Sequence, residues 1–416
     1  MFFGWKVVGV VFVVAFFGFG IGFYAAAVFL AATHERQGWP ISLISFAITA
    51  YFVLGASLTL FCGDAYERFG PRRVVLGTMG ALALGVVLLG CATRPWQMYA
   101  AFGVMAFGWA GMGGAAINAL VAPWFDRRRG LAVSIAFNGA TAGGAVMVPL
   151  WTVLIARLGF PSAATVVAGG MAILLIPLAL RYLHRSPADI GLRPDGVLEG
   201  AGDPARRPAR STVRRRDLVR SRRFWTISAP FALALFAQVG VLTHAISYLA
   251  PRLGPHGAAL GVSLATIAAI VGRLAAGLVV DRIDRRTVVA GNFLVQEVAV
   301  TALIAASSPP ALYAACALFG LGVGNVTSFP ALIVQAEYPS EHFNRTVSLI
   351  VAINQFTFAF GPGVLGVMRD LSGSYAVAFA LGAACETLAA IVVLMKPRDL
   401  PTARALRRSR GTHAPT

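Results

Sequence analysis

Residues 63–73 read Gly-Asp-Ala-Tyr-Glu-Arg-Phe-Gly-Pro-Arg-Arg, and residues 277–286 read Gly-Leu-Val-Val-Asp-Arg-Ile-Asp-Arg-Arg. Both stretches follow long apolar runs, and both place an acid–arginine pair and then two further arginines after a glycine. Each fits a short charged turn between two membrane helices, with a glycine that lets the helices approach closely. The two copies start 214 residues apart. Charge anchoring alone does not require the same pattern twice, so the repetition predicts two equivalent halves.

Outward from these turns, the chain is built of apolar runs that are long enough to cross a bilayer, which takes about 20 residues. Hydrophobic residues make up 57% of the chain and charged residues 12%, whereas a soluble domain carries about 25% charged residues. The runs lie at roughly 7–32, 41–63, 74–93, 97–122, 130–155, 160–181, 224–250, 258–280, 287–306, 311–335, 346–368 and 374–395. We therefore expect an all-α polytopic membrane protein with twelve transmembrane helices in two six-helix halves. This composition excludes a soluble multidomain enzyme.

A segment rich in Arg, Pro, Asp and Gly separates the two sets of six runs. We expect an N-terminal half over 1–184, a basic linker over 185–223, a C-terminal half over 224–396 and a basic tail over 397–416. Of the 35 Lys and Arg residues, 29 fall on the side of the linker, and Arg273 falls inside a run. The other five are Arg36, Arg94, Arg157, Arg252 and Arg369. The positive-inside rule therefore places both termini and the linker in the cytoplasm, with the spans in an inner or plasma membrane.

Several classes of function are not supported by the sequence. The net charge of +18 is spread between apolar runs rather than gathered on one domain, so nucleic acid is not an expected partner. The four cysteines are widely spaced and form no CxxC pair or Cys/His cluster, so no metal site is expected. Gly111-x-Gly113-Gly114 lacks the Lys-Ser/Thr that follows in a phosphate-binding loop. We therefore expect no cofactor, no enzymatic activity and no ATP-driven transport.

The duplicated turn resembles the signature loop of the major facilitator superfamily, and the resemblance extends over the twelve spans, the central segment and both loop copies. It implies a transporter whose halves rock around a central site. Acid–arginine pairs at such turns can break and re-form as the halves move, so we expect six residues to take part in gating. These are Glu67, Arg68, Arg72, Asp281, Arg282 and Arg285. The first copy has Glu67 where the family more often has aspartate, and the second has Asp284 where glycine is usual.

A narrower resemblance is carried by four further motifs. They are Gly4-Trp5, Gly38-Trp39-Pro40-Ile41-Ser42, Arg128-Arg129-Gly130-Leu131-Ala132, and Gly361-Pro362-x-x-x-Gly366 followed by Asp370 and Gly373-Ser374-Tyr375. Together they look like the monocarboxylate porter and oxalate–formate exchanger branch of the superfamily, which implies small organic anions as substrates. A drug–proton antiporter would carry a Gly-Pro pair in the fifth span, where Gly144 stands in place of the proline. Drug efflux is therefore ranked lower.

Only three formal charges lie well inside predicted spans, namely Arg273, Glu297 and Glu386. A charge near the bilayer centre costs roughly 3 kcal/mol or more, so each requires a partner or a function. Arg273 lies eight residues before Asp281, or about 12 Å from the end of its span, at the depth where transporter sites form. Its planar guanidinium matches a carboxylate, which favours substrate binding over the alternative of a buried ion pair with Glu297 or another acid.

The resemblance adds three expectations for this site. In the monocarboxylate branch an arginine of the eighth span binds the carboxylate, and Arg273-x-x-x-Gly277 matches that pattern. Some relatives carry an acid four residues before this arginine, where this chain has Ala269. If that acid serves proton coupling in the relatives, another residue must do so in this chain. Oxalate exchangers also use a lysine in span eleven, but Asn354 and Gln355 occupy that depth in this chain. One buried cation balances one negative charge, which favours a monocarboxylate over oxalate.

Further polar residues inside the spans are candidates for proton coupling or for the cavity. His244 titrates near neutral pH and is a candidate proton relay, although it can equally be a satisfied packing residue. Glu297 is a second coupling candidate, but for Glu297 and Glu386 structural hydrogen bonds are the simpler expectation. The cavity candidates beside Arg273 are Tyr24, Asn118, Gln238, Tyr248, Asn325, Asn354 and Gln355. Such residues also serve as contacts between helices.

These observations predict a secondary active transporter of small organic anions that works by alternating access. We expect a proton-coupled monocarboxylate symporter in which Arg273 binds the substrate carboxylate, and a monomer, since one chain supplies both halves. The partners would be the anion, a proton and the bilayer. An organic-anion exchanger and a drug-efflux antiporter are kept as alternatives, with a non-transporting membrane sensor ranked below them.

Overall fold

The computed structural model describes residues 2–125, 128–184, 186–196, 215–280 and 282–395. The regular elements in these ranges are all helical, as the apolar runs predict. Ten of the described helices are long and apolar enough to cross a membrane. The predicted tail over 397–416 lies outside the described residues, and so does Asp281.

The N-terminal half begins with a long rod and ends at Tyr182. Its elements are α1 (Gly4–Phe19), the π-helical segment η1 (Gly20–Tyr24), α2 (Ala26–Gln37), α3 (Ile41–Thr59), α4 (Cys62–Phe69), α5 (Pro71–Cys91), α6 (Pro95–Met112), α7 (Gly114–Val121), the 3₁₀ turn η2 (Ala122–Trp124), α8 (Arg129–Leu158) and α9 (Phe160–Tyr182). Glycines in the left-handed region end α2, α4 and α8, namely Gly38, Gly70 and Gly159. Glycine adopts this conformation without the penalty of a side chain, so these positions fix where the spans turn.

The central segment contains more regular structure than a plain linker. The described parts of 185–223 include the 3₁₀ turns η3 (Pro187–Ile190) and η4 (Pro194–Gly196), and the short helix α10 (Arg215–Arg220). The basic linker predicted over 185–223 thus contains short helical elements where the structure describes it.

The C-terminal half consists of α11 (Arg222–Val279), α12 (Arg285–Ala305), α13 (Pro309–Val323), α14 (Phe329–Glu337), α15 (Ser340–Phe358), α16 (Gly361–Ser372) and α17 (Tyr375–Leu394). The 58 residues of α11 would measure about 87 Å as one helix, far more than the roughly 30 Å hydrocarbon core of a bilayer. Gly254 has a φ of +73° and divides α11 into a first segment, 222–253, and a second segment, 255–279. The broken pairs α13–α14 and α15–α16 supply one predicted span each, so every one of the twelve expected spans has a helical counterpart.

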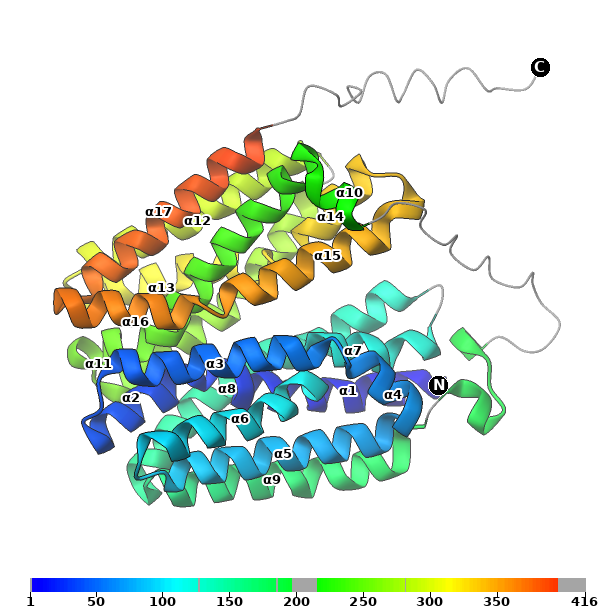
Figure 1. Ribbon diagram of the computed structural model, residues 1–416, viewed down its shortest axis with the longest axis horizontal. Helices are drawn as coiled ribbons and strands as arrows, with labels where there is room; N and C mark the ends of the chain where they lie inside the picture. Colours follow the sequence, from blue (N-terminus) through cyan, green and yellow to red (C-terminus); the bar gives the residue numbers. More distant parts are fainter. Residues whose placement is uncertain (1, 126–127, 185, 197–214, 281, 396–416) are drawn as a thin grey trace.

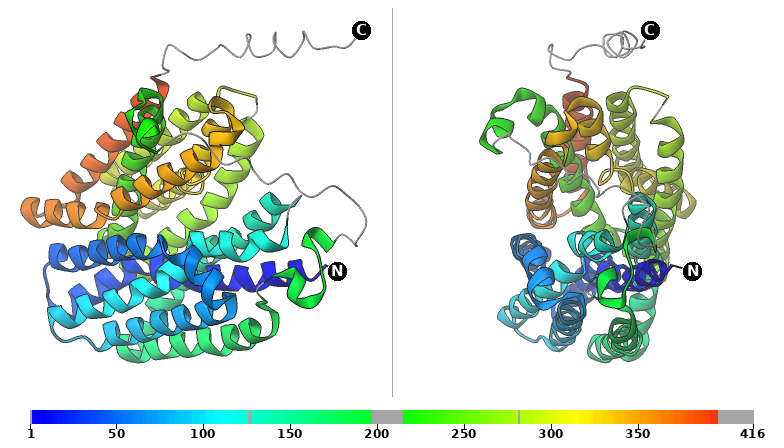
Figure 2. Two further views of the ribbon diagram at one scale, coloured as in Figure 1. Left: turned by 45° about the vertical axis from the view of Figure 1, so that its right-hand side comes forward. Right: turned by 90° about the vertical axis from the view of Figure 1, so that its right-hand side faces the viewer.

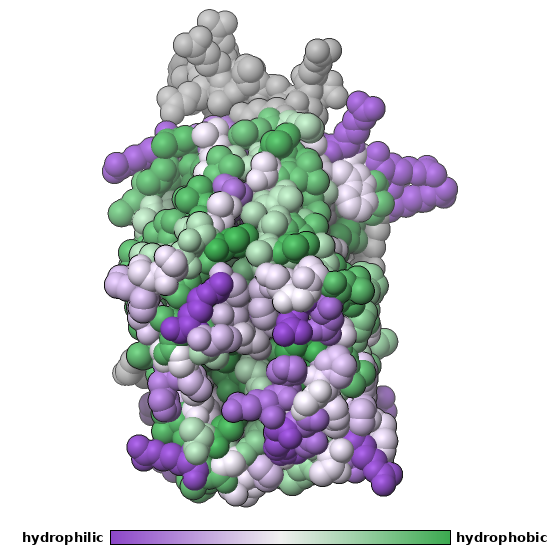
Figure 3. Space-filling view, turned by 90° about the vertical axis from the view of Figure 1, so that its left-hand side faces the viewer, coloured by the Kyte–Doolittle hydropathy of each residue, from purple (hydrophilic) through white to green (hydrophobic). Residues whose placement is uncertain are grey.

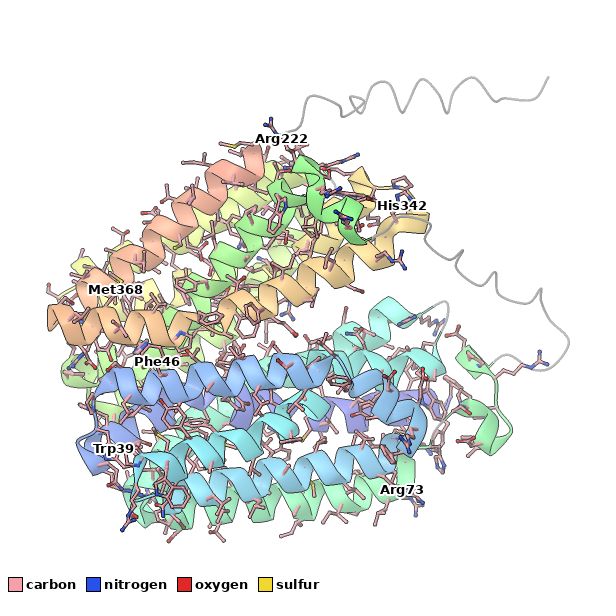
Figure 4. All side chains as sticks on the ribbon, viewed as in Figure 1. Trp39, Phe46, Arg73, Arg222, His342 and Met368 are labelled. Carbon is pink, nitrogen blue, oxygen red and sulfur yellow. The ribbon has the colours of Figure 1, made fainter. Side chains whose placement is uncertain are left out.

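The two halves form two bundles that lie side by side (Figure 1). The start of α1, α4, α10 and α14 lie at one end, which we call the terminal end, and the turn from α2 to α3 lies at the opposite, far end (Figure 1). Arg73, Arg222 and His342 are labelled at the terminal end, whereas Trp39 lies at the far end (Figure 4). Seen along the long axis, the helices of each half surround their own centre (Figure 2).

The halves meet mainly through α3 with α16 and α8 with α11, and also through α2 with α11 and α3 with α15. Phe46 on α3 and Met368 on α16 lie on facing helices towards the far end (Figure 4). Three hydrogen bonds with both partners described join the halves. They run from the Ser42 amide to Asp370 Oδ2 (2.7 Å), from the Gly363 amide to Thr49 Oγ1 (3.0 Å) and from Ser263 Oγ to the Ala145 carbonyl (2.9 Å). Each of these hydrogen bonds lies nearer the far end than the terminal end. The far end carries hydrophilic side chains across much of its face (Figure 3).

The motif glycines have no close neighbour in this arrangement. A side-chain carbon at Gly63 or at Gly277 would meet nothing within 4 Å. The expectation that these glycines permit close helix approach was therefore wrong, since each lies on an open face beside its turn. Close approach occurs instead at Gly272 and Gly320, where a side-chain carbon would overlap the backbone of Leu321 and Ala265 respectively. These contacts pack α11 tightly against α13.

Candidate functional site

Arg273 lies on the second segment of α11, one residue after the close contact of Gly272 with α13. Its side chain is partly buried, and its Nε donates a 3.3 Å hydrogen bond to the Gly324 carbonyl. Gly324 caps α13, where the last carbonyls of the helix have no partner within it and carry partial negative charge. The tight α11–α13 contact thus fixes the guanidinium at the break between α13 and α14.

The guanidinium of Arg273 is not neutralised by a neighbouring acid. Among the described residues, no carboxylate lies within ion-pair distance of Arg273, and the bond to Gly324 is the one hydrogen bond that they give it. The two terminal nitrogens are therefore available as a fork, which is the geometry that binds a carboxylate with two parallel hydrogen bonds. A partly buried guanidinium without an acidic partner can bind an anion that enters and leaves the site.

Tyr24 lies in the N-terminal half, where it faces the second segment of α11. A side-chain carbon on Gly144 would lie 2.8 Å from both the Tyr24 ring and the Thr266 methyl group, so α8, η1 and α11 meet at this point. Tyr24 is partly buried. It also lines a small pocket with Phe23 and residues of α11, namely Val239, Leu242, Thr243 and Val262. The structure thus places Tyr24 between the halves near Thr266, which lies seven residues before Arg273 on the same segment of α11.

The π-helical segment that carries Tyr24 was not foreseen from the sequence. Residues Gly20–Tyr24 adopt i→i+5 hydrogen bonding between two α-helices. Such single turns are rare and occur frequently at functional sites. The glycines at 18, 20 and 22 pack against Met112, Met147 and Trp109 respectively. These contacts leave little room for side chains on that side of the helix.

His244 lies on the first segment of α11, away from Arg273, and faces α16 and α17. It is fully buried, with Nε2 2.9 Å from the Pro362 carbonyl and Nδ1 3.4 Å from the Tyr375 hydroxyl. Because a carbonyl only accepts, Nε2 carries the hydrogen, and Nδ1 is the nitrogen that can take up a proton. Tyr248, one turn further on, donates a 2.5 Å hydrogen bond to the Leu303 carbonyl. The structure therefore places His244 and Tyr248 in a layer separate from Arg273.

The two intramembrane acids do not reach Arg273 either. Glu297 accepts a 3.1 Å hydrogen bond from Thr301 on its own helix, so α12 does not bring it inward as an ion-pair partner. Glu386 is fully buried in α17, and both of its oxygens lack a hydrogen-bond partner among the described residues. The structural hydrogen bonds expected for Glu297 are present, whereas those expected for Glu386 are not found within the described ranges.

The amide candidates divide into two groups. Asn325 donates to Asn292 Oδ1 (2.9 Å), to the Leu321 carbonyl (3.1 Å) and to the Gly272 carbonyl (3.3 Å), so it ties α13 to α11 and α12 directly behind Arg273. Asn118 is exposed and donates to the Gly114 carbonyl of its own helix at 2.9 Å.

Three amides remain as groups that could contact a ligand. Gln238 and Asn354 are buried, and the amide oxygen of each has no partner among the described residues. Gln355, next to Asn354 on α15, is partly buried. Buried oxygens without partners can accept a hydrogen bond from a ligand hydroxyl, so these positions fit a polar substituent of a substrate.

The described members of the predicted gating set lie at the terminal end, whereas Asp281 is outside the described residues. Arg285 donates from Nη1 to the Leu332 carbonyl, and the Arg68 guanidinium lies 5.4 Å from the Phe69 ring centre. Glu67 lies on α4 beside Arg68, Arg282 lies in the turn after α11, and Arg72 Nε is buried with no partner among the described residues. Next to Glu67, the Tyr66 hydroxyl donates 2.6 Å to the Gly111 carbonyl, and burial raises the pKa of Tyr66 well above its usual value.

One strong ion pair at the terminal end was missed. Arg286 is only 1% exposed, and it donates from Nε to Glu337 Oε1 at 2.6 Å and from Nη2 to Oε2 at 2.9 Å. Nη1 also donates to the Val393 carbonyl at 2.8 Å, and Nη2 to Thr226 Oγ1 at 3.1 Å. Arg286 belongs to the second motif copy, but nothing in the sequence pairs it with an acid 51 residues away. The pair joins α11, α12, α14 and α17 within the C-terminal half.

The chain was compared with known proteins. Its sequence is 25% identical over 421 residues to monocarboxylate transporter 11 of Mus musculus, covering 96% of this chain and 88% of the relative. It is 27% identical over 318 residues to the MFS transporter asaE of Aspergillus flavus, covering 75% of this chain and 68% of the relative. Its fold matches a crystal structure of the nucleoside transporter NupG with a TM-score of 0.74 at 11% identity, covering 93% of this chain and 99% of that one.

A family model also matches both halves of the chain. The structure contains two bundles of membrane-length helices, two charged turns and a candidate site between the halves. The model of the Major Facilitator Superfamily matches residues 10–256 and again 246–416, so each half is matched separately. The chain is therefore an integral membrane transporter of the Major Facilitator Superfamily.

Proposed function

We propose that this protein is a proton-coupled symporter of monocarboxylates and that Arg273 binds the substrate carboxylate. The observation that supports this proposal is the partly buried guanidinium of Arg273, which has no acidic partner among the described residues and keeps two terminal nitrogens free. An uncompensated charge inside a bilayer is costly, so a transported anion that neutralises it stabilises the loaded carrier. The similarity to monocarboxylate transporter 11 supports the same substrate class.

The charge balance favours one carboxylate over two. The chain contains lysine only at positions 6 and 396, near the ends of its first and last spans. A dianion at Arg273 would therefore leave about one negative charge unbalanced in a medium of low dielectric constant. Gln238, Asn354 and Gln355 supply neutral amides, which suit a hydroxyl or keto oxygen better than a second carboxylate.

We assign the coupling proton to His244 in the first instance. Its Nδ1 faces the Tyr375 hydroxyl, whose oxygen can accept a hydrogen bond once Nδ1 is protonated. Proton uptake at His244 would thus exchange the donor and acceptor in this pair without breaking the bond from Nε2 to Pro362. Glu297 and Glu386 are further candidates for the same role.

Alternating access follows from the division into two halves, 1–184 and 224–396, joined through 185–223. The hydrogen bonds between the halves that the structure describes lie nearer the far end. We propose that the far end faces the outside and that these contacts open when the halves rock, while the gating residues close the terminal, cytoplasmic end. A monomer suffices, because one chain provides both halves.

Uptake into proteoliposomes tests this function. Labelled lactate, pyruvate and larger monocarboxylates should accumulate when the proton concentration is higher outside, and Arg273→Gln should abolish the accumulation. The matched control is Arg252→Gln, which removes an arginine that stacks 4.2 Å from the Tyr248 ring near the far end. Accumulation that needs a second anion inside instead of a pH gradient would replace symport with exchange. Uptake of hydrophobic cations but of no anion would replace both with drug efflux.

A further inference from the structure

We propose that the monocarboxylate carries an aromatic body, which stacks on a group of rings opposite Arg273. This inference rests on the proposed function, since it presumes that Arg273 holds the carboxylate. The ring group consists of Phe19, Phe23, Trp109 and Phe137 from the N-terminal half and Phe358 from the C-terminal half.

The rings form one continuous surface. Phe19 contacts Trp109 at 5.0 Å and Phe137 at 6.4 Å between ring centres, both edge to face. Phe23 stacks on Trp109 at 5.9 Å with an angle of 20° between the planes, and meets Phe358 across the halves at 6.5 Å. These residues come from α1, η1, α6, α8 and α15, so the surface is built by the fold and not by neighbours in sequence.

Phe137 of the ring group lies at the depth of Arg273. The helices α8 and α11 run antiparallel, since Ala145 bonds to Ser263 and Gly144 meets Thr266. Phe137 is seven residues from Gly144, and Arg273 is seven residues from Thr266, both towards the terminal end. Seven residues of helix span about 10 Å on each side, so the two side chains come from the same depth on opposite halves.

The π-helical segment η1 places Phe19 and Tyr24 on the same side of the helix. Bonding of the i→i+5 type places residues five apart above one another, which applies to Phe19 and Tyr24. Phe23 and Tyr24 both line the pocket between the halves. Phe19, Phe23 and Phe137 all remain partly exposed, so ring surface is available to a ligand.

The chemistry selects an aromatic monocarboxylate. Aromatic rings pair best with other rings, either edge to face or offset, and both geometries occur within the group. A two- or three-carbon acid held at Arg273 would leave most of this surface without a contact. A cationic aromatic compound is excluded, because the uncompensated guanidinium of Arg273 would repel it.

Binding to the purified protein tests the inference with matched pairs of anions. Phenylpyruvate and pyruvate, and 3-phenyllactate and lactate, differ by one ring, and phenethylamine serves as the cationic control. We expect each aromatic acid to bind at least tenfold more tightly than its counterpart, and phenethylamine not to bind. Phe137→Leu should cut this ratio to below threefold, and Phe23→Leu should do the same.

The outcomes separate this inference from the proposed function. If pyruvate binds as tightly as phenylpyruvate, and both lose affinity in Arg273→Gln, the aromatic preference is wrong and the proposed function stands. If no monocarboxylate binds, or if Arg273→Gln binds all of them as the parent does, the proposed function itself fails. Should the ring variants not fold, which melting of the unliganded proteins shows, the comparison of paired anions on the parent protein decides alone.

Discussion

The Asp370 carboxylate of the C-terminal half accepts a 2.7 Å hydrogen bond from the backbone amide of Ser42 in the N-terminal half. Ser42 lies in the first turn of α3, where amide groups have no partner within the helix and favour negative charge. The other carboxylate oxygen accepts a 2.9 Å hydrogen bond from Arg369. The acid of the Gly361–Tyr375 motif thus joins the two halves near the far end, in a contact that must break if this end opens.

Asp370→Asn should favour opening of the far end. A neutral amide accepts a weaker hydrogen bond than a carboxylate, and the difference of about 1 kcal/mol corresponds to roughly a fivefold change in the open-to-closed ratio. Distance distributions between spin labels on the far ends of α3 and α16 measure this ratio. Asp64→Asn on α4 at the terminal end is the control and should leave the distances unchanged. An unaltered distribution in Asp370→Asn would show that this contact does not hold the halves together.

Glu337→Gln should destabilise the C-terminal half by about 3–5 kcal/mol, because it leaves the buried Arg286 charge without its partner. Thermal unfolding of the purified protein measures the loss. Replacing both residues together, as in Arg286→Met with Glu337→Leu, removes the unpaired charge and should restore much of the stability. A single variant as stable as the parent would contradict the assignment of this pair as a structural clamp.

Gly320→Ala should lower the melting temperature, because the added carbon meets the Ala265 backbone carbonyl where α13 crosses α11. Overpacking of this kind typically costs about 1–3 kcal/mol. Gly277→Ala is the matched control on α11, since a side-chain carbon there meets nothing within 4 Å and alanine favours a helix. Equal melting temperatures for the two variants would mean that the α11–α13 contact can relax freely.

His244→Gln should uncouple transport from the proton gradient. The glutamine amide can still donate to the Pro362 carbonyl but cannot bind a proton, so exchange of labelled for unlabelled substrate should persist while gradient-driven accumulation is lost. His34→Gln provides the control, because His34 contacts the Trp39 carbonyl at 2.7 Å near the far end and has no proposed role in coupling. Full accumulation by His244→Gln would move the coupling proton to Glu297, Glu386 or another group.

Much of the fold was predictable because it depends on local properties. The length of an apolar run determines whether a helix can span the bilayer, and all twelve expected spans have helical counterparts. The division of α11 at Gly254 was also predictable, since it falls between the expected spans 224–250 and 258–280, where Pro251 and Pro255 disfavour a continuous helix. The turns at Pro187–Ile190 and Pro194–Gly196 were not predicted, because no apolar period runs through the central segment.

Residues of the candidate site were predictable only where a side chain was chemically unusual for an apolar span. Arg273 is an arginine in an apolar run, so its cost alone made it conspicuous. Glu337 is an ordinary acid at the end of a helix, and its pairing with Arg286 depends on how α12 and α14 pack. The ring group is drawn from 28 phenylalanines and seven tryptophans, whose frequency in membrane helices conceals the few that face the centre. The π-helical turn before Tyr24 depends on close packing of three glycines, which no local pattern specifies.

Ligand-induced thermal stabilisation of the purified protein, compared with Arg273→Gln and Arg252→Gln, tests the central claim most directly. The panel contains lactate, pyruvate, larger aliphatic and aromatic monocarboxylates, oxalate and formate. We expect at least one monocarboxylate to stabilise the parent and Arg252→Gln equally, and its affinity for Arg273→Gln to be at least 100-fold lower, since a charged hydrogen-bonded pair is lost. If the same anion stabilises Arg273→Gln as strongly as the parent, Arg273 is not the carboxylate ligand.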